Sequence, residues 1–291
     1  MFAYYYEKKI IDKTYLKEDK RMTNIVFVGA GSMAEAIIHG LLEENKVSPD
    51  SICVMNKSDQ KHLQYLQSKY QIDIMCSEKL ALQKADIVFL AMKPKDAIDA
   101  CKDISLYINK TATIVSVIAG VSIQTIESYL GERPIARVMP NTSASVGLSA
   151  SALCCNDKIN DLSKKVIINL LESIGTVMLV EEEDMHVVTA LSGSGPAYLY
   201  YFAEQFEAAA VLHGLSKEDA RQLFFQTMKG AAHMLMNGSV EPAELRRKVT
   251  SPGGTTEAGI EQLMSHKVDE AIFACIDAAQ QKSRILGKQY E

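Results

Sequence analysis

Short apolar runs alternate with longer amphipathic stretches from Thr23 to about Glu182. Residues 24–28 form an apolar run typical of a strand buried on both faces, and the residues after it place apolar side chains at helical spacing. Further strands are predicted over 51–55, 72–75, 86–92, 111–117, 134–139, 148–154 and 176–180. Helices are predicted between them, over 34–44, 62–70, 80–84, 96–101 and 162–172 and after Ser122. This alternation predicts an α/β fold with a doubly wound parallel sheet and right-handed crossovers.

The strand pattern stops after about Glu182, and the remaining chain predicts helices alone. The expected helices begin near Pro196, Ser216, Pro242, Thr255 and Val268. Apolar residues cover more than one side of the second of these helices, namely Leu223, Phe224, Phe225, Met228, Met234, Leu235 and Met236. Because helices that are apolar all round are buried on all sides, we expect the C-terminal helices to pack against a second copy of the chain.

Composition narrows the class of protein. Hydrophobic residues make up 47% of the 291 residues, but no run resembles a membrane span. The formal net charge of -5 argues against a nucleic-acid partner. Six scattered cysteines without C-x-x-C spacing, together with the lack of a secretory signal, favour reduced cysteines in a cytoplasmic protein. The histidines show no metal-ligand spacing, so no metal is expected.

The first predicted strand runs directly into G-A-G-S-M-A, a G-x-G-x-x-A motif that opens a predicted helix. Gly29 allows the tight turn, Gly31 lets the backbone approach a pyrophosphate, and Ala34 lets the helix pack on the strand. The helix N-terminus adds N–H donors and a positive dipole. In this strand–turn–helix context the motif predicts a Rossmann-like dinucleotide-binding domain.

The end of the second strand is where such domains select their cofactor. An acidic residue there would bind the ribose 2′-hydroxyl of NAD, but this chain has Asn56, Lys57 and Ser58. These side chains can donate to a 2′-phosphate, so we expect a preference for NADPH, with NADH as the second option. Loops over 91–94, 119–120 and 139–142 follow later strands and are predicted to line the crevice for the nicotinamide half.

These features divide the chain into three parts. Residues 1–21 form an extension rich in tyrosine and lysine before a second candidate start at Met22, and they are expected to be dispensable. Residues 22–182 are expected to form the Rossmann-like NADP-binding domain. Residues 183–291 are expected to form the helical domain.

Six stretches of the chain carry a family resemblance: V-G-A-G-S-M-A, A-M-K-P, A-G-V-S-I, R-V-M-P-N-T, L-S-G-S-G-P-A-Y and V-T-S-P-G-G-T-T. With them the chain resembles the pyrroline-5-carboxylate reductases from Asn24 to its last helix. The resemblance implies an oxidoreductase that reduces 1-pyrroline-5-carboxylate to L-proline by hydride transfer from NAD(P)H, the last step of proline biosynthesis. It also implies an all-α C-terminal dimerisation domain, dimers that often assemble further, and an active site between a Rossmann domain and helices of the dimer.

The resemblance further implies the residues of the site. Cofactor contacts are implied for Gly29, Gly31, Ser32, Met33, Asn56, Lys57, Ala91, Met92, Lys93, Ala119 and Asn141. Substrate contacts are implied for Glu182, Thr189, Ser251, Gly253, Gly254, Thr255 and Thr256.

The stretch T-S-P-G-G-T-T-E-A-G-I, residues 250–260, has a physical reason for its adjacent glycines. The substrate carboxylate needs N–H donors, and Gly253 and Gly254 leave the backbone bare at a helix N-terminus that can supply them. We expect Thr256 to be the catalytic residue by hydrogen-bonding the ring nitrogen. A protonated imine is already electrophilic, so the reaction requires mainly the orientation of two bound reactants.

The chain departs from the family pattern at two places. Ser143 stands where the family usually has proline, and Arg247 and Lys248 stand where an acidic residue is common. These departures leave open a non-catalytic NADPH-binding regulatory relative, and the sequence does not separate a reductase of a related cyclic imine acid. A β-hydroxyacid dehydrogenase is disfavoured, because that class has a catalytic lysine followed by asparagine, whereas Lys229 is followed by Gly230.

Overall fold

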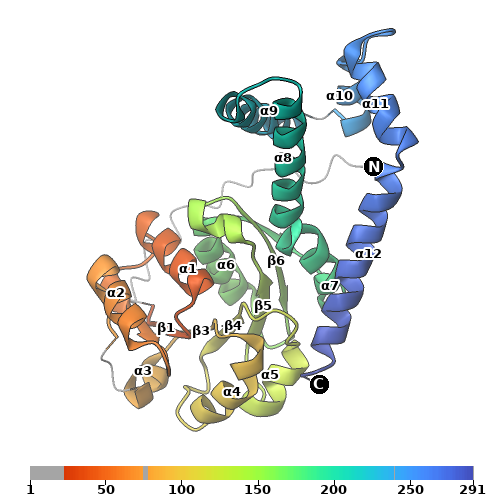
Figure 1. The fold of residues 1–291 in the computed structure, drawn as a ribbon. Coiled ribbons are helices and arrows are strands. Elements are labelled where there is room, and N and C mark those ends of the chain that lie inside the picture. The colour runs from red at the N-terminus through yellow and green to blue at the C-terminus, as the bar shows by residue number, and fades with distance from the viewer. Residues whose placement is uncertain (1–22, 75–77, 239, 291) are drawn as a thin grey trace.

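The computed structural model describes residues 23–74, 78–238 and 240–290, so the extension expected over 1–21 lies outside the described residues. Seven strands form one sheet in the order β2-β1-β3-β4-β5-β6-β7 (Figure 1). The strands are β1 (Ile25–Val28), β2 (Ile52–Met55), β3 (Ile87–Leu90), β4 (Thr113–Ser116), β5 (Ile135–Met139), β6 (Ser149–Cys155) and β7 (Gly175–Leu179).

The first five strands are parallel, which confirms the expected Rossmann-like α/β domain. The last two strands differ, because β6 runs antiparallel to β5 and β7 runs parallel to β6. Only a short 3₁₀ segment, η3 (Thr142–Val146), lies between β5 and β6. A connection without a crossover helix can join antiparallel neighbours but not parallel ones, so the reversal follows from the short link.

The expected strand over 72–75 is wrong as a full strand. Its described part makes a single parallel bridge, between Asp73 and Cys53 at the edge of β2. Ile72 is buried and Ile74 is half-buried against the same apolar cluster, whereas Asp73 between them is exposed. The expectation of reduced cysteines holds for Cys101, Cys154, Cys155 and Cys275, which are free, but it is wrong for Cys53, which is disulfide-bonded.

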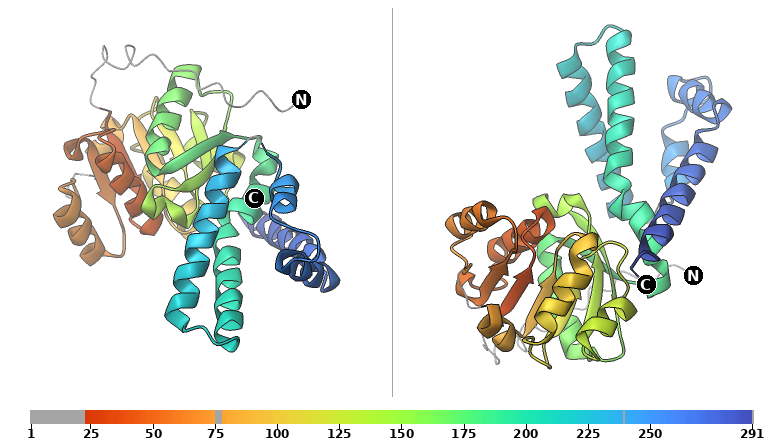
Figure 2. Two further views of the ribbon diagram at one scale, coloured as in Figure 1. Left: turned by 90° about the horizontal axis from the view of Figure 1, so that it is seen from above. Right: turned by 60° about the horizontal axis from the view of Figure 1, so that its bottom comes forward.

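Helices cover both faces of the sheet (Figures 1 and 2). Successive residues of β1 point to opposite faces of the sheet: Ile25 and Phe27 belong to one buried cluster, and Val26 and Val28 belong to the other. Phe27 stacks on Phe89 with ring centroids 4.7 Å apart, which ties β1 to β3. The covering helices are α1 (Ser32–Glu43), α2 (Gln60–Tyr70), α3 (Glu78–Lys84), α4 (Ala97–Ser105), α5 (Ile123–Leu130) and α6 (Asp161–Leu171). Further 3₁₀ turns are η1 (Pro49–Ser51), η2 (Pro94–Asp96), η4 (Glu172–Ile174) and η5 (Glu182–Asp184).

Beyond β7 the chain is helical, as expected. It passes through α7 (Met185–Val188) and a π-helical turn, η6 (Thr189–Gly193), into α8 (Gly195–Leu212), α9 (Lys217–Asn237), α10 (Pro242–Lys248), α11 (Thr255–Ser265) and α12 (Val268–Gly287). Helices α8 and α9 form one arm that stands away from the sheet, and α10 to α12 form a second arm (Figures 1 and 2). The far end of α12 returns to pack against α7 and η6. None of the helices in the described ranges is long and apolar enough to cross a membrane.

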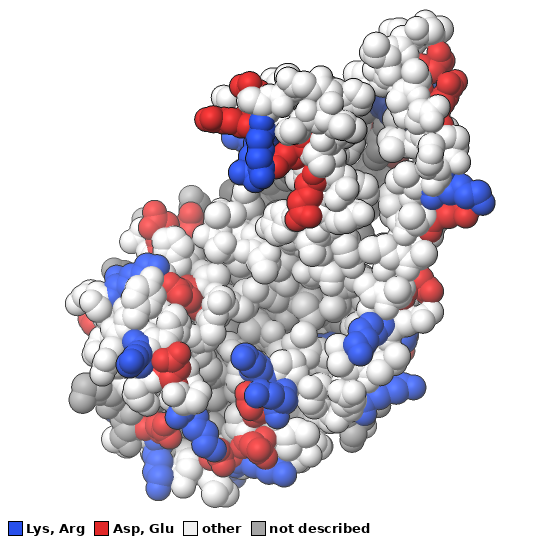
Figure 3. Space-filling model, viewed as in Figure 1, with Lys and Arg blue, Asp and Glu red and all other residues white. Residues whose placement is uncertain are grey.

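The two arms leave most of their apolar side chains uncovered. Among the described residues of α8 to α12, only Ala220, Ser283 and Gly287 are buried. Large apolar side chains that are exposed include Leu199, Tyr200, Tyr201, Phe206, Leu223, Phe225, Met234, Leu235, Met264, Ile272 and Phe273. Figure 3 shows few charged residues on the viewed surface between the arms and the sheet. Much of the apolar surface of α8 to α12 is therefore not buried by other described residues of the same chain.

Candidate functional site

The loop between β1 and α1 turns sharply beneath the end of β3. Gly29 has a φ of +105°, which favours glycine, and its N–H donates to the Met55 carbonyl at 2.9 Å. A Cβ on Gly29 would lie 2.6 Å from the carbonyl carbon of Ala91. Any side chain here would therefore displace backbone, and Gly29 forms the tight turn that the motif predicted.

Gly31 leaves the start of α1 open. It is the N-cap residue, with extended backbone and no side-chain cap, and a Cβ added to it would meet nothing within 4 Å. Ser32 is exposed, whereas Ala34 is fully buried and lets α1 pack closely on the sheet. The first N–H groups of a 12-residue helix thus adjoin unfilled space, an arrangement that fits the pyrophosphate of a dinucleotide.

A cleft of about 400 Å³ lies beside this loop, at the carboxyl ends of β1, β2 and β3. Gly29, Asn56, Lys57 and Met92, which were predicted to contact the cofactor, are among its lining residues, and their contact with a cofactor stays a prediction. Lys57 Nζ lies 3.6 Å from Asp103 Oδ2, with the two side chains 90% and 66% exposed. An ion pair this exposed is weak, so the lysine is available to a ligand phosphate.

The same cleft has an acidic side that was not predicted from the sequence. Asp96, Asp99 and Asp103 from η2 and α4, together with Glu78, line it, and Lys57 is the only cation among its described lining residues. Asp99 lies in the helix predicted over 96–101, but Asp103 enters the same helix only because α4 extends to Ser105, so the sequence carried only part of this signal. These carboxylates oppose a 2′-phosphate, which makes Lys57 the residue that offsets them.

The remaining strand-end residues are placed as follows. Ala91 N–H donates to the Val28 carbonyl at 2.9 Å and thereby joins the end of β3 to the β1 loop. Lys93, two residues on, is exposed at the start of η2. Ala119 is also exposed, and the next residue, Gly120 (φ +80°), lies against Gly287 at the end of α12.

Asn141 is already engaged by protein groups. Its Oδ1 accepts from the Ser143 N–H at 3.0 Å, and its Nδ2 donates to the Ser192 carbonyl at 3.1 Å. The second bond links the end of β5 to η6, and the Asn141 side chain is buried. A direct contact with nicotinamide stays a prediction for Asn141.

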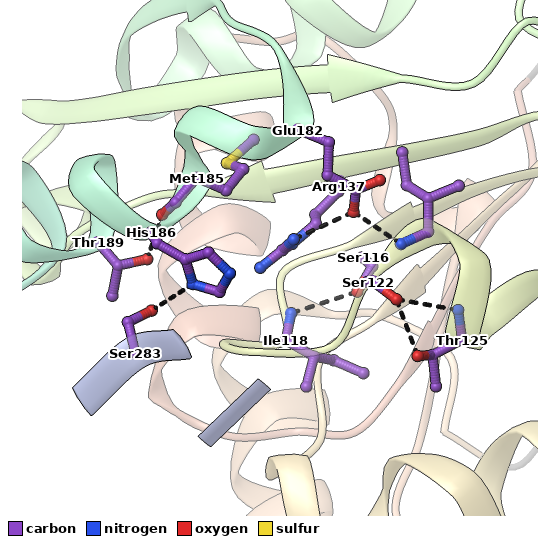
Figure 4. A network of polar contacts seen from close by, with 11 residues as sticks. Ser116, Ile118, Ser122, Thr125, Arg137, Glu182, Met185, His186, Thr189 and Ser283 are labelled. Atoms are coloured by element: carbon purple, nitrogen blue, oxygen red, sulfur yellow. Dashed lines mark hydrogen bonds and ion pairs between the residues drawn. The ribbon is translucent and has the colours of Figure 1, made fainter. Parts of the chain in front are cut away.

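Glu182 lies in a network of polar contacts with residues of β5 and α5 (Figure 4). Its Oε1 accepts from Arg137 Nη1 at 3.1 Å and from the Ile123 N–H at 2.8 Å. The Arg137 side chain is only 3% exposed, and its Nε and Nη2 are buried without a hydrogen-bond partner. Glu182 therefore forms an ion pair with the buried guanidinium of Arg137. The family resemblance implied only a substrate contact for Glu182.

A hollow of about 320 Å³ beside Glu182 is lined by residues of β6, including Cys154. Burial, with the Glu182 charge adding to it, raises the pKa of the Cys154 thiol to about 12. The thiol therefore stays protonated near neutral pH and is no nucleophile. Within the described residues, no group of three or more His, Cys, Asp or Glu side chains is arranged to hold a metal ion.

The residues implied for the substrate do not come together in one chain. Thr189, in η6, donates its Oγ1 hydrogen to the Met185 carbonyl at 2.6 Å. The loop over 251–254 instead lies before α11, at the end of the second arm that is distant from the sheet (Figures 1 and 2). Gly253 has a φ of +72°, Gly254 is the extended N-cap of α11, and Thr255 and Thr256 are exposed.

Comparison with known proteins agrees with this division. The model for pyrroline-5-carboxylate reductase dimerisation matches residues 182–286, and the model for NADP oxidoreductase, coenzyme F420-dependent, matches residues 24–120. Pyrroline-5-carboxylate reductase 2 of Bacillus subtilis is 42% identical over 273 residues, which cover 92% of this chain and 97% of the relative.

Solved structures show the same similarity. A pyrroline-5-carboxylate reductase from Coxiella burnetii matches with a TM-score of 0.85 and 35% identity, covering 91% of this chain and 98% of the other. The Plasmodium falciparum pyrroline carboxylate reductase, solved with NADP bound, matches with a TM-score of 0.82 and 29% identity over 91% and 98% of the two chains.

Replacement of Gly31 by alanine should separate cofactor binding from folding. The added Cβ meets no protein atom but occupies the space at the start of α1, so we expect NADPH affinity to fall about tenfold with little change in melting temperature. Fluorescence titration and thermal unfolding measure the two effects. Gly29→Ala is the contrasting variant, because its Cβ meets backbone and should lower the melting temperature as well.

Glu182→Gln should destabilise the fold, because it removes the charge that pairs with buried Arg137. Loss of one partner of a buried pair costs about 3–5 kcal/mol, and we expect about 2 kcal/mol here because Glu182 is 36% exposed. Urea unfolding checks this, with exposed Glu183→Gln as the matched control. Unchanged stability together with a raised KM for substrate would instead favour direct substrate binding by Glu182.

Proposed function

We propose that this chain, which belongs to the pyrroline-5-carboxylate reductase family, reduces 1-pyrroline-5-carboxylate to L-proline with NADPH as the hydride donor. The observation that carries the proposal is the open N-terminus of α1 above Gly31, which fits a dinucleotide in a chain similar to these reductases over nine tenths of its length. The reaction is the last step of proline biosynthesis. A cytoplasmic location for it stays a prediction.

NADPH is favoured by the end of β2. Asn56 and Lys57 line the cleft there, and neither is an acid that would repel a 2′-phosphate. Lys57 would exchange its weak pairing with Asp103 for the phosphate. NADH, which lacks this phosphate, would leave the Lys57–Asp103 pair in place and remains the second cofactor. The relative solved with NADP agrees with this preference.

The substrate loop supplies the other half of the chemistry. The N–H groups at the start of α11, with Ser251 and Thr255 beside them, suit the substrate carboxylate. Thr256 would hydrogen-bond the ring nitrogen. In the reaction the C=N carbon gains a hydride and the nitrogen keeps a proton, so the imine becomes an amine while NADPH is oxidised. Such a step depends on the alignment of two bound reactants more than on a strong acid.

A second copy of the chain would complete this site. The substrate loop lies at the end of an arm, distant from the cofactor cleft of its own sheet (Figure 2). The exposed apolar side chains of α8 to α12 require a cover, and the dimerisation model matches this part of the chain. We propose a homodimer through these helices, able to assemble further, in which each active site combines the cleft of one chain with α11 of its partner.

The three parts of the chain would then have separate roles. Residues 22–182 would bind the cofactor, 183–291 would form the dimer and bind the substrate, and 1–21 would be dispensable. The sheet ends with β7 at Leu179, and the helices of the arms follow, in agreement with a boundary near residue 182.

Turnover tests the proposed function. Oxidation of NADPH followed at 340 nm should be rapid with 1-pyrroline-5-carboxylate, slower with NADH, and slower with the six-membered imine piperideine-6-carboxylate. Faster turnover of the six-membered imine would reassign the substrate. NADPH binding without turnover of either imine would indicate a regulatory relative.

Mixed dimers test the shared active site. Thr256→Ala should lower kcat/KM about 100-fold, because it removes a positioned hydrogen-bond partner, and near-normal kcat/KM would refute that role. Gly31→Glu should abolish cofactor binding by placing a carboxylate beside the pyrophosphate. Co-expression of the two variants should restore about a quarter of wild-type activity, since half the dimers are mixed and each has one intact site. No recovery in mixed dimers, confirmed by two affinity tags, would place each whole site in one chain.

A further inference from the structure

The N–H groups of both glycines in the substrate loop are occupied within the chain. Gly254 N–H donates to the Ser251 carbonyl at 3.0 Å. Gly253 N–H donates to a carboxylate, Oε2 of Glu257, at 2.7 Å. The second contact concerns the proposed function directly, because a carboxylate of the protein lies on one of the donors expected to receive the carboxylate of the substrate.

Glu257 is well placed to hold this position. It is the third residue of α11, so its negative charge lies in the first helical turn, where the helix dipole favours an anion. Among the described residues no Lys or Arg forms an ion pair with Glu257. The side chain is therefore held by the loop N–H and the helix N-terminus, the same features that would bind a substrate carboxylate.

The contact differs from an ordinary capping box. In a capping box the third helical residue bonds the N–H of the N-cap residue, which is Gly254 here. Glu257 instead reaches one residue further back, to Gly253, whose positive φ of +72° turns the backbone at this point. The Gly254 N–H already has Ser251 as its acceptor, so the helix start does not need Glu257 to satisfy it.

We propose that the Glu257 carboxylate is an internal competitor that occupies the substrate-carboxylate position and is displaced when substrate binds. This role rests on the proposed function, and it makes Glu257 a specificity-determining residue. A ligand with its own carboxylate replaces the lost hydrogen bond, whereas a ring without one does not. Because part of the binding energy is used to move Glu257, the KM for substrate is higher than the loop alone would give.

Glu257→Gln tests the proposal, with Glu261→Gln as its matched control. Glu261 lies one turn further along α11, is exposed, and its replacement changes the net charge by the same amount. Removing the charged competitor should lower the KM for 1-pyrroline-5-carboxylate about fivefold, with kcat within about twofold of wild type and the KM for NADPH unchanged. Glu257→Ala, which cannot reach Gly253, should show a KM at least as low. Glu261→Gln should change the KM less than twofold.

The alternative roles predict different results. If Glu257 only organises the loop, both variants should raise the KM for substrate, and that result overturns the proposal. Equal KM values for the 257 and 261 variants also overturn it, because a general charge effect then suffices. The ring 1-pyrroline, which has the same imine but lacks the carboxylate, should show no gain from Glu257→Gln, and an equal gain would contradict competition for the carboxylate position.

Wild-type turnover separates failure of the proposed reaction from failure of the proposed role of Glu257. Absence of turnover with 1-pyrroline-5-carboxylate overturns the proposed function and the role of Glu257 with it. Normal wild-type turnover with an unchanged KM in Glu257→Gln overturns the role of Glu257 alone.

Discussion

Apolar side chains lie exposed along α8 to α12, and such a surface is stable in water only when another surface covers it. In the sheet part, α1 to α7 and the strands enclose the two apolar clusters, and fewer large apolar side chains are exposed, among them Met178 and Leu179 of the edge strand β7. The helical part therefore depends on assembly more than the sheet part does. The separation of the cofactor cleft from α11 follows from the same division, since helices that reach toward a partner carry their loops away from their own sheet (Figure 1).

Polar contacts add to apolar packing where the helical part joins the sheet, because Met185 of α7 is fully buried in one of the two apolar clusters of the sheet. Arg137 in β5 pairs with Glu182, and Asn141 at the end of the same strand binds the Ser192 carbonyl. His186 Nδ1 lies 3.0 Å from Ser283 Oγ, which joins α7 to α12 (Figure 4). Hydrogen bonds fix direction more narrowly than apolar packing does. These contacts therefore set where the arms point, and so where each arm would meet a partner.

The sequence predicted the features that depend on local pattern. Three such features were predicted correctly: the buried strand β1, the glycine turn after it, and the start of α11 after Gly254. Burial selects apolar residues and a positive φ selects glycine, so both can be recognised from residue type. The reversal of β6 was missed, although the predicted strands over 134–139 and 148–154 leave too short a link for a crossover helix.

Other misses arise from contacts between segments. The 72–75 segment has the apolar alternation of a strand, but only Asp73 bridges to β2. Asp103 lines the cleft because the fold brings α4 beside the residues that follow β2. The bond from Gly253 to Glu257 was not predicted, because it forms only where the loop turns back toward the first turn of α11. Site residues that belong to one continuous motif were therefore predicted. Charged residues that other elements bring to the site were not.

The π-helical turn at Thr189–Gly193 has a consequence for how the family can change. A π turn holds one residue more than an α turn, and each residue of an α-helix advances it by about 100°. Because the wider turn absorbs its extra residue, loss of one residue there would restore an α turn and leave α8 facing nearly the same way. Loss of one residue within α8 itself would instead rotate every later side chain by that angle and turn the interface side toward solvent. The family can therefore change length at this turn more safely than within the helices that it joins.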